Sequence, residues 1–99
     1  MTPGALLLLA AAVFAVGLFG VLARRHAVGV LISIELMFNA VNLAIAAIAW
    51  SRGLVAGVVI VLFGIAITVA EIAIGLALVL LASRARRTSV LDDLDAMRG

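Results

Sequence analysis

The sequence predicts an all-α membrane protein with three antiparallel transmembrane helices. Of its 99 residues, 68% are hydrophobic and only 12% are charged, whereas a soluble domain of this length needs a far more polar surface. The hydrophobic residues also form three long runs, which are separated by breaks of only a few polar residues. We therefore expect a single three-helix membrane domain over residues 1–99.

The composition also excludes several kinds of site. Cysteine is absent, so a disulfide framework, thiolate catalysis and a cysteine-ligated metal are ruled out. The single histidine cannot form a metal site alone, and we expect no metal in this chain. The few aromatic residues provide no surface for stacking bases, and the arginines lie at the ends of apolar runs. We expect the lipid bilayer, and no nucleic acid, as a partner.

The first helix is expected over residues of about 4–23. This uncharged run would make a helix of roughly 30 Å, which is about the thickness of a bilayer core. It lacks a basic start and runs into Arg24 and Arg25 instead of a cleavage site. These features favour a retained transmembrane helix over a signal peptide.

The second helix is expected over about 27–50 and the third over about 54–82, with only short breaks between the helices. The third run is long enough to span a bilayer with some tilt. Residues 83–99 form a polar cytoplasmic tail, which we expect to be mobile or to form a short amphipathic turn. Its larger apolar residues are spaced three apart: Leu91, Leu94 and Met97.

The arginines predict the orientation of the helices. The first loop contains Arg24 and Arg25, whereas the second loop contains only Arg52. Four more arginines follow the third run: Arg84, Arg86, Arg87 and Arg98. Because basic residues accumulate on the cytoplasmic side, we expect the N-terminus outside and the C-terminus in the cytoplasm. The expected location is a bacterial cytoplasmic (inner) membrane, with several passes through it.

Two carboxyl groups interrupt the apolar runs, Glu35 in the second helix and Glu71 in the third. In the expected orientation they lie roughly 12 Å and 16 Å from the inner boundary, at similar depth. Acids within transmembrane segments are costly and commonly mark an ion pathway or a proton relay. Burial favours the protonated form of a carboxyl group, which can then load and release a proton. We therefore predict that both buried glutamates take part in proton translocation.

Other polar residues share faces with the two acids. Asn39 and Asn42 follow Glu35 by four and seven residues, and Thr68 precedes Glu71 by three. The alternative to a relay is structural, because a protonated glutamate or an asparagine can also join neighbouring helices by hydrogen bonds. Three helices with two buried acids cannot enclose a path unaided. We therefore expect a subunit of a larger membrane complex.

Several segments resemble a known family. Residues 17–26 (GLFGVLARRH) and 32–43 (ISIELMFNAVNL) are similar to the K subunit of proton-pumping NADH:quinone oxidoreductase, respiratory complex I, whose mitochondrial counterpart is subunit 4L. Residues 70–78 (AEIAIGLAL) and the ending 92–99 (DDLDAMRG) resemble the same family, so the similarity covers nearly the whole chain.

The resemblance implies that Glu35 and Glu71 belong to a charged axis that couples quinone reduction, elsewhere in the complex, to proton movement. It implies a role for Arg24 and Arg25, which match the arginine pair of the family's cytoplasmic loop, and neighbouring subunits of the A, J and N types. FMN, iron–sulfur clusters and a quinone would lie in other subunits, with no redox cofactor or catalytic redox site in this chain. Related complexes use other donors, so NADH stays open as the electron donor.

Two other functions remain as alternatives. The chain could be the C-type subunit of a multisubunit cation/proton antiporter, which has no redox chemistry, although the aspartate-rich ending favours the redox complex. It could also be an independent small transporter or a rotor subunit. Three spans, with acids in the second and third, argue against this last interpretation.

Overall fold

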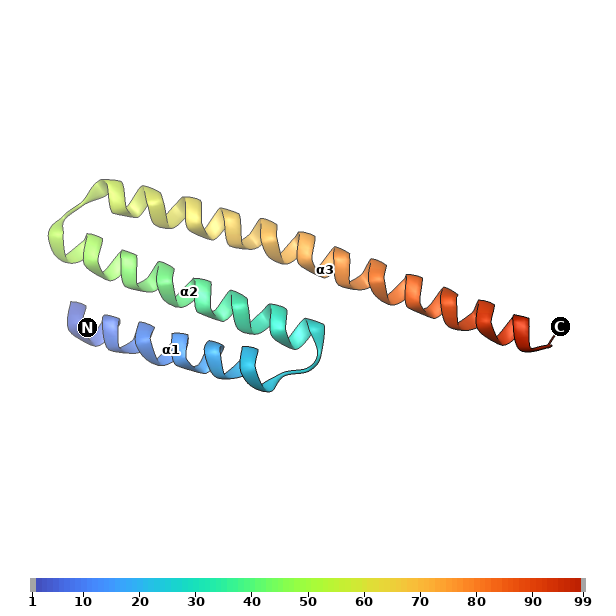
Figure 1. Cartoon of the computed structure of the whole chain (residues 1–99). Coiled ribbons are helices and arrows are strands. Elements are labelled where there is room, and N and C mark those ends of the chain that lie inside the picture. Colours follow the sequence, from blue (N-terminus) through green and yellow to red (C-terminus); the bar gives the residue numbers. More distant parts are fainter. Residues whose placement is uncertain (1, 99) are drawn as a thin grey trace.

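The computed structural model describes residues 2–98 and consists of three helices side by side in one layer (Figure 1). The helices are α1 (Pro3–Ala23), α2 (Ala27–Arg52) and α3 (Val55–Arg98). Within the described residues, α2 packs against both α1 and α3, and those two outer helices do not touch each other. The molecule measures 70 × 26 × 14 Å, so the layer is only one helix thick. The predicted all-helical fold is confirmed.

Local sequence explains where α1 and α2 begin and end. The hydroxyl group of Thr2 accepts a hydrogen bond from the Ala5 amide at 3.2 Å, and Pro3 occupies the first turn, where a missing N–H is harmless. At the C-terminal end of α2, Gly53 ends the helix by adopting a left-handed conformation with φ of 63°. Arg52 adds a positive charge at the negative end of the α2 dipole.

The third helix is longer than the sequence predicted. Its apolar part ends near Ala82, but the helix continues without a break to Arg98. This differs from the expected mobile tail or short turn, because residues 83–97 contain arginine, alanine, leucine and methionine but no glycine or proline. Residues 83–98 therefore extend the helix by roughly 24 Å beyond its apolar length. Gly99 lies outside the described residues.

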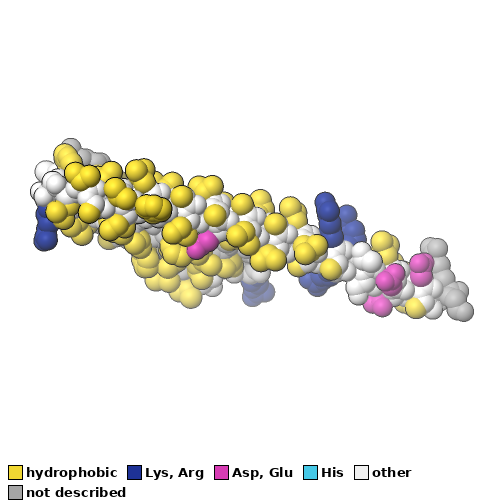
Figure 2. All heavy atoms as spheres, turned by 90° about the horizontal axis from the view of Figure 1, so that it is seen from above, with side chains coloured by type: hydrophobic (Ala, Val, Ile, Leu, Met, Phe, Trp, Pro, Cys, Tyr) yellow, Lys and Arg dark blue, Asp and Glu magenta, His cyan; other side chains and the backbone are white. Residues whose placement is uncertain are grey.

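All three helices are long and apolar enough to cross a membrane. Large hydrophobic side chains point outward over most of the surface; Leu8 and Phe19, for example, are 74% and 72% exposed. Figure 2 shows this apolar length in yellow, with basic side chains at its left end, at its lower edge and where it ends on the right. Most of the visible acidic side chains lie near the C-terminal end, and one lies within the apolar length. A surface of this kind is suited to lipid, so the chain has the character of a multi-pass membrane protein.

The residues buried between the helices are small. Alanine or glycine occupies most of these positions: Ala10, Gly17, Ala40, Ala47 and Ala49. Small side chains allow helix backbones to approach closely, which is how helices associate in lipid without a hydrophobic driving force. The polar residues buried in the same core are Ser33, Glu35 and Thr68.

Candidate functional site

Glycines fix the register between α2 and α3. A Cβ atom added at Gly57 would meet Ala49, one at Gly64 would meet the amide of Asn42, and one at Gly75 would meet Leu31. Each step toward the C-terminus of α3 is therefore matched by a step toward the N-terminus of α2. We call this antiparallel contact the α2–α3 seam.

The register places Glu71 level with Glu35. Glu71 follows Gly64 by seven residues, and Glu35 precedes the partner of that glycine, Asn42, by seven. Gly75 and its partner Leu31 lead to the same pairing, each four residues away. The structure thus brings together the two acids that lie far apart in the sequence.

The two acids differ in exposure. Glu35 is only 8% exposed, whereas Glu71 is exposed although Gly64, Thr68 and Gly75 along the same helix face are covered. Within this chain alone, the burial expected for both glutamates is found for Glu35, whereas Glu71 is not covered by the other two helices. Glu71 lies at the rim of the seam, because its position is turned away from the centre of the α2-facing stripe. One carboxyl is enclosed within the chain and the other is exposed on its surface.

The two asparagines occupy different places. Asn42 is half-buried in the α2–α3 seam, against Gly64. Asn39 is exposed, so it does not line the seam with Glu35 and Asn42 as the spacing suggested. A residue four positions along a helix is displaced by about 40° around the axis, which is enough to move Asn39 from the contact to its flank.

The hydroxyl group of Thr68 is used within its own helix. It donates to the carbonyl oxygens of Gly64 and Ile65, at 2.7 Å and 3.0 Å, in a shared hydrogen bond. Thr68 is 7% exposed and lies in the seam one turn before Glu71. Because a hydroxyl oxygen also accepts hydrogen bonds, Thr68 can still present an acceptor to the seam.

Arg24 and Arg25 lie in the exposed loop between α1 and α2, away from the acids. The aliphatic stem of Arg24 packs over Gly29, where an added Cβ would lie 3.3 Å from the Arg24 Cγ. Gly29 is roughly 9 Å from Glu35 along the axis of α2. The structure therefore places both arginines at the end of the layer and not beside either carboxyl group.

Sequence reasoning missed Ser33, which is as buried as Glu35 but lies on the opposite side of α2. Its hydroxyl donates to the Gly29 carbonyl at 2.8 Å and contacts the position of Gly20 in α1. The three-residue spacing of Gly17 and Gly20 was the available signal, because both glycines face α2 closely. Ser33 therefore marks the α1–α2 contact.

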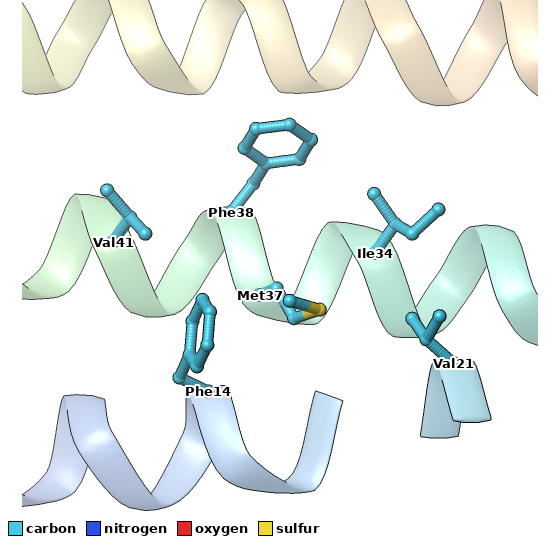
Figure 3. A pocket seen from close by; sticks show the side chains of 6 residues that line it. All are labelled: Phe14, Val21, Ile34, Met37, Phe38 and Val41. Atoms are coloured by element: carbon cyan, nitrogen blue, oxygen red, sulfur yellow. The ribbon is translucent and has the colours of Figure 1, made fainter. Parts of the chain in front are cut away.

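A shallow groove of about 240 Å³ also lies between α1 and α2 (Figure 3). Its lining is apolar throughout: Phe14, Val21, Ile34, Met37, Phe38 and Val41. It offers no polar group to orient a substrate. Within residues 2–98, no group of histidine and acidic residues is arranged to hold a metal ion. Among the described residues, the buried polar side chains other than Ser33 thus lie in the α2–α3 seam.

Comparison with known proteins identifies the family. The sequence model of NADH-ubiquinone/plastoquinone oxidoreductase chain 4L matches residues 5–99. The chain belongs to the subunit K/4L family of these oxidoreductases. This confirms the resemblance seen in the sequence and makes the chain a membrane subunit of an NADH-quinone oxidoreductase complex.

Relatives in this K/4L family align over most of the chain. Subunit K of NADH-quinone oxidoreductase from Myxococcus xanthus is 51% identical over 92 residues, covering 93% of this chain and 92% of the relative. Subunit 11 from Thermus thermophilus is 46% identical over 93 residues, covering 94% and 97%. Subunit K 2 from Streptomyces griseus is 57% identical over 88 residues, covering 87% of this chain and 60% of the relative.

Proposed function

We propose that Glu35 and Glu71 form a carboxyl pair on the charged axis of the membrane arm of complex I. Quinone reduction elsewhere in the complex would be coupled to proton movement along this axis. The observation that carries the proposal is the α2–α3 register, which sets an enclosed carboxyl level with an exposed one. In this arrangement, the exposed Glu71 faces a neighbouring subunit, and the protonation state of the enclosed Glu35 depends on that of Glu71.

The coupling follows from the electrostatics of two close acids. When two carboxyl groups lie near each other away from water, ionising both is unfavourable, so their protonation states depend on each other. A proton arriving at Glu71, or leaving it, therefore changes the free energy of ionising Glu35. The pair can relay a proton or transmit the charge of one.

The other polar residues have supporting roles in this proposal. Asn42 and Thr68 lie in the seam on the same side of the carboxyl pair, toward the start of α3, and can hydrogen-bond water or a protonated carboxyl. Asn39 lies outside the seam, where it would contact a neighbouring subunit. Arg24 and Arg25 would fix the cytoplasmic loop and its contacts.

We further propose that the chain contains no redox site. Without cysteine it cannot hold an iron–sulfur cluster by thiolates, so FMN, the clusters and the quinone would belong to other subunits. NADH as the electron donor is supported by the names of the relatives from Myxococcus and Thermus. The chain's part in the reaction is then that of a proton-conducting subunit.

The proposed neighbours are the A, J and N subunits, in a bacterial cytoplasmic membrane with the N-terminus outside and the C-terminus in the cytoplasm. The distribution of arginine supports this orientation. The exposure of Glu71 and Asn39 supports close neighbours, because polar side chains facing lipid at this position would be costly.

The Glu35→Gln variant tests the proposal, with Ser33→Ala as its matched control. Both residues are 8% exposed and lie on α2, but Ser33 faces α1. Glu35→Gln should leave the complex assembled and lower coupled quinone reduction and proton pumping by about tenfold or more, because glutamine cannot exchange a proton. Ser33→Ala should change neither. Normal pumping by assembled Glu35→Gln complex would contradict the assignment.

A further inference from the structure

We propose that the cleft between the start of α2 and the C-terminal half of α3 binds the headgroup of an anionic phospholipid. The cleft, here called the headgroup cleft, has a volume of about 730 Å³. Its polar end is lined by His26, Ser83 and Arg86. Its apolar walls include Val28, Leu78 and Val79.

The cleft exists because α3 is longer than its partner helix. Gly75 lies opposite Leu31, and α2 begins at Ala27, only four residues further on. Beyond that level, the α2-facing side of α3 has no helix of this chain against it. Arg86 follows the half-buried Val79 by seven residues, so it continues the α2-facing stripe past the start of α2. The Arg86 guanidinium group therefore lies near the end of the α2–α3 seam at which α2 begins.

The polar end of the cleft carries the donors that a phosphate group requires. The Arg86 guanidinium provides a charge and several N–H groups, and the Ser83 hydroxyl can donate one hydrogen bond. The His26 imidazole donates at least one hydrogen bond in either protonation state. In addition, the His26 side chain makes no capping hydrogen bond to α2, so it does not occupy the first backbone N–H groups of this helix. These groups come from the loop, from α2 and from α3.

The shape of the cleft favours a lipid over a free anion. Val28, Leu78 and Val79 belong to the apolar lengths of α2 and α3, whereas Ser83 and Arg86 lie just beyond the apolar length of α3. The lining therefore changes from apolar to cationic at the boundary of the hydrocarbon layer. A phospholipid has the same change in polarity at the same depth, and basic pockets between transmembrane helices are suited to anionic headgroups.

The neighbouring Arg84 provides a matched control. It has the same charge and lies two residues before Arg86, but it lines another groove with Ala77, Leu80 and Leu81, which shares only Leu80 with the headgroup cleft. A general attraction of arginines to anionic lipid would involve both residues equally. A specific site requires Arg86 and not Arg84.

The test uses the assembled complex in phosphatidylcholine vesicles that contain a photoactivatable phosphatidylglycerol. Labelled peptides covering residues 26–28 and 78–86 of this chain are quantified by mass spectrometry. Arg86→Gln should lower labelling by about fivefold, the effect of losing one phosphate contact by arginine. Arg84→Gln should leave the labelling unchanged. A photoactivatable phosphatidylcholine should label these peptides much less than the anionic probe does.

Several outcomes would overturn this inference. Equal labelling in the Arg86→Gln and Arg84→Gln complexes would show a general surface effect, and loss of labelling with inorganic phosphate would show an anion site without lipid selectivity. Labelling of a neighbouring subunit, with none of the peptides 26–28 and 78–86 labelled, would show that lipid does not reach the cleft. If Arg86→Gln prevents assembly, His26→Gln carries the test, with a smaller decrease expected. Because lipid labelling is measured apart from proton pumping, the result does not depend on the proposed role of Glu35.

Discussion

The two sides of α2 are built differently. On one side, small residues of α1 lie against small residues of α2, with Ser33 as the only polar side chain buried there among the described residues. On the other side, the α2–α3 seam contains four polar residues: Glu35, Asn42, Thr68 and Glu71. The same central helix therefore has one contact made for close packing and another that carries polar chemistry.

The glycines show how this difference arises. A Cβ added at Gly17 would lie 2.9 Å from the Ser33 carbonyl oxygen and 3.1 Å from the Met37 amide nitrogen. Those are backbone atoms of a helix, which cannot move aside. A Cβ added at Gly64 would instead meet the end of the Asn42 side chain, which can rotate. The α1–α2 contact is thus rigid at Gly17, whereas the α2–α3 seam can adjust around Asn42 at Gly64. At Gly57 the seam is also tight, because an added Cβ would meet the Ala49 Cβ, which cannot rotate away.

The largest effect on assembly is expected from Gly17→Ala, which disrupts the close contact between α1 and α2. The added methyl group would force the α1 and α2 backbones apart, at a cost of about 1–3 kcal/mol. We expect much less of the chain in the assembled complex, measured by native gel and immunoblot of membranes.

Gly64→Ala is the control for this change, because it adds the same methyl group to the other side of α2. Rotation of Asn42 should absorb it, so assembly should be largely retained. Equal losses of assembly in the two variants would contradict the contrast between a rigid contact and an adjustable seam.

A smaller effect is expected from Thr68→Val, which removes the hydroxyl group but preserves the shape of the side chain. Both of its hydrogen bonds are to carbonyls of its own helix, so the loss should destabilise the complex by no more than about 1 kcal/mol. We expect the rate of proton pumping, measured in reconstituted vesicles, to stay within about twofold of the wild type. A change in rate of about twofold corresponds to a change in activation free energy well below about 1 kcal/mol. A loss of pumping as large as that of Glu35→Gln would make Thr68 an essential member of the path.

Much of this arrangement was predictable from the sequence. The three apolar runs and their short breaks require antiparallel helices, and the positions of Glu35 and Glu71 within their runs predicted similar levels. Sequence spacing could not show that Glu71 lies at the rim, because exposure depends on how α3 is rotated against α2. The same rotation of α2 leaves Asn39 outside the seam.

The continuation of α3 could not be predicted from hydropathy. The sequence after Ala82 changes from apolar to polar, and that change predicts an end of the helix where there is none. The boundary of an apolar run marks where a helix leaves the hydrocarbon layer, whereas the helix itself ends only where the backbone is interrupted. Residues 83–97 contain no such interruption.

The most direct test of the central claim compares the Glu35→Gln, Glu71→Gln double variant with each single variant in the assembled complex. Protons pumped per electron are measured alongside quinone reduction. Because residues acting as a unit are not additive, the double variant should lose coupled pumping about as completely as Glu35→Gln alone. Normal coupled pumping by the assembled double variant would contradict a proton-carrying role for the pair.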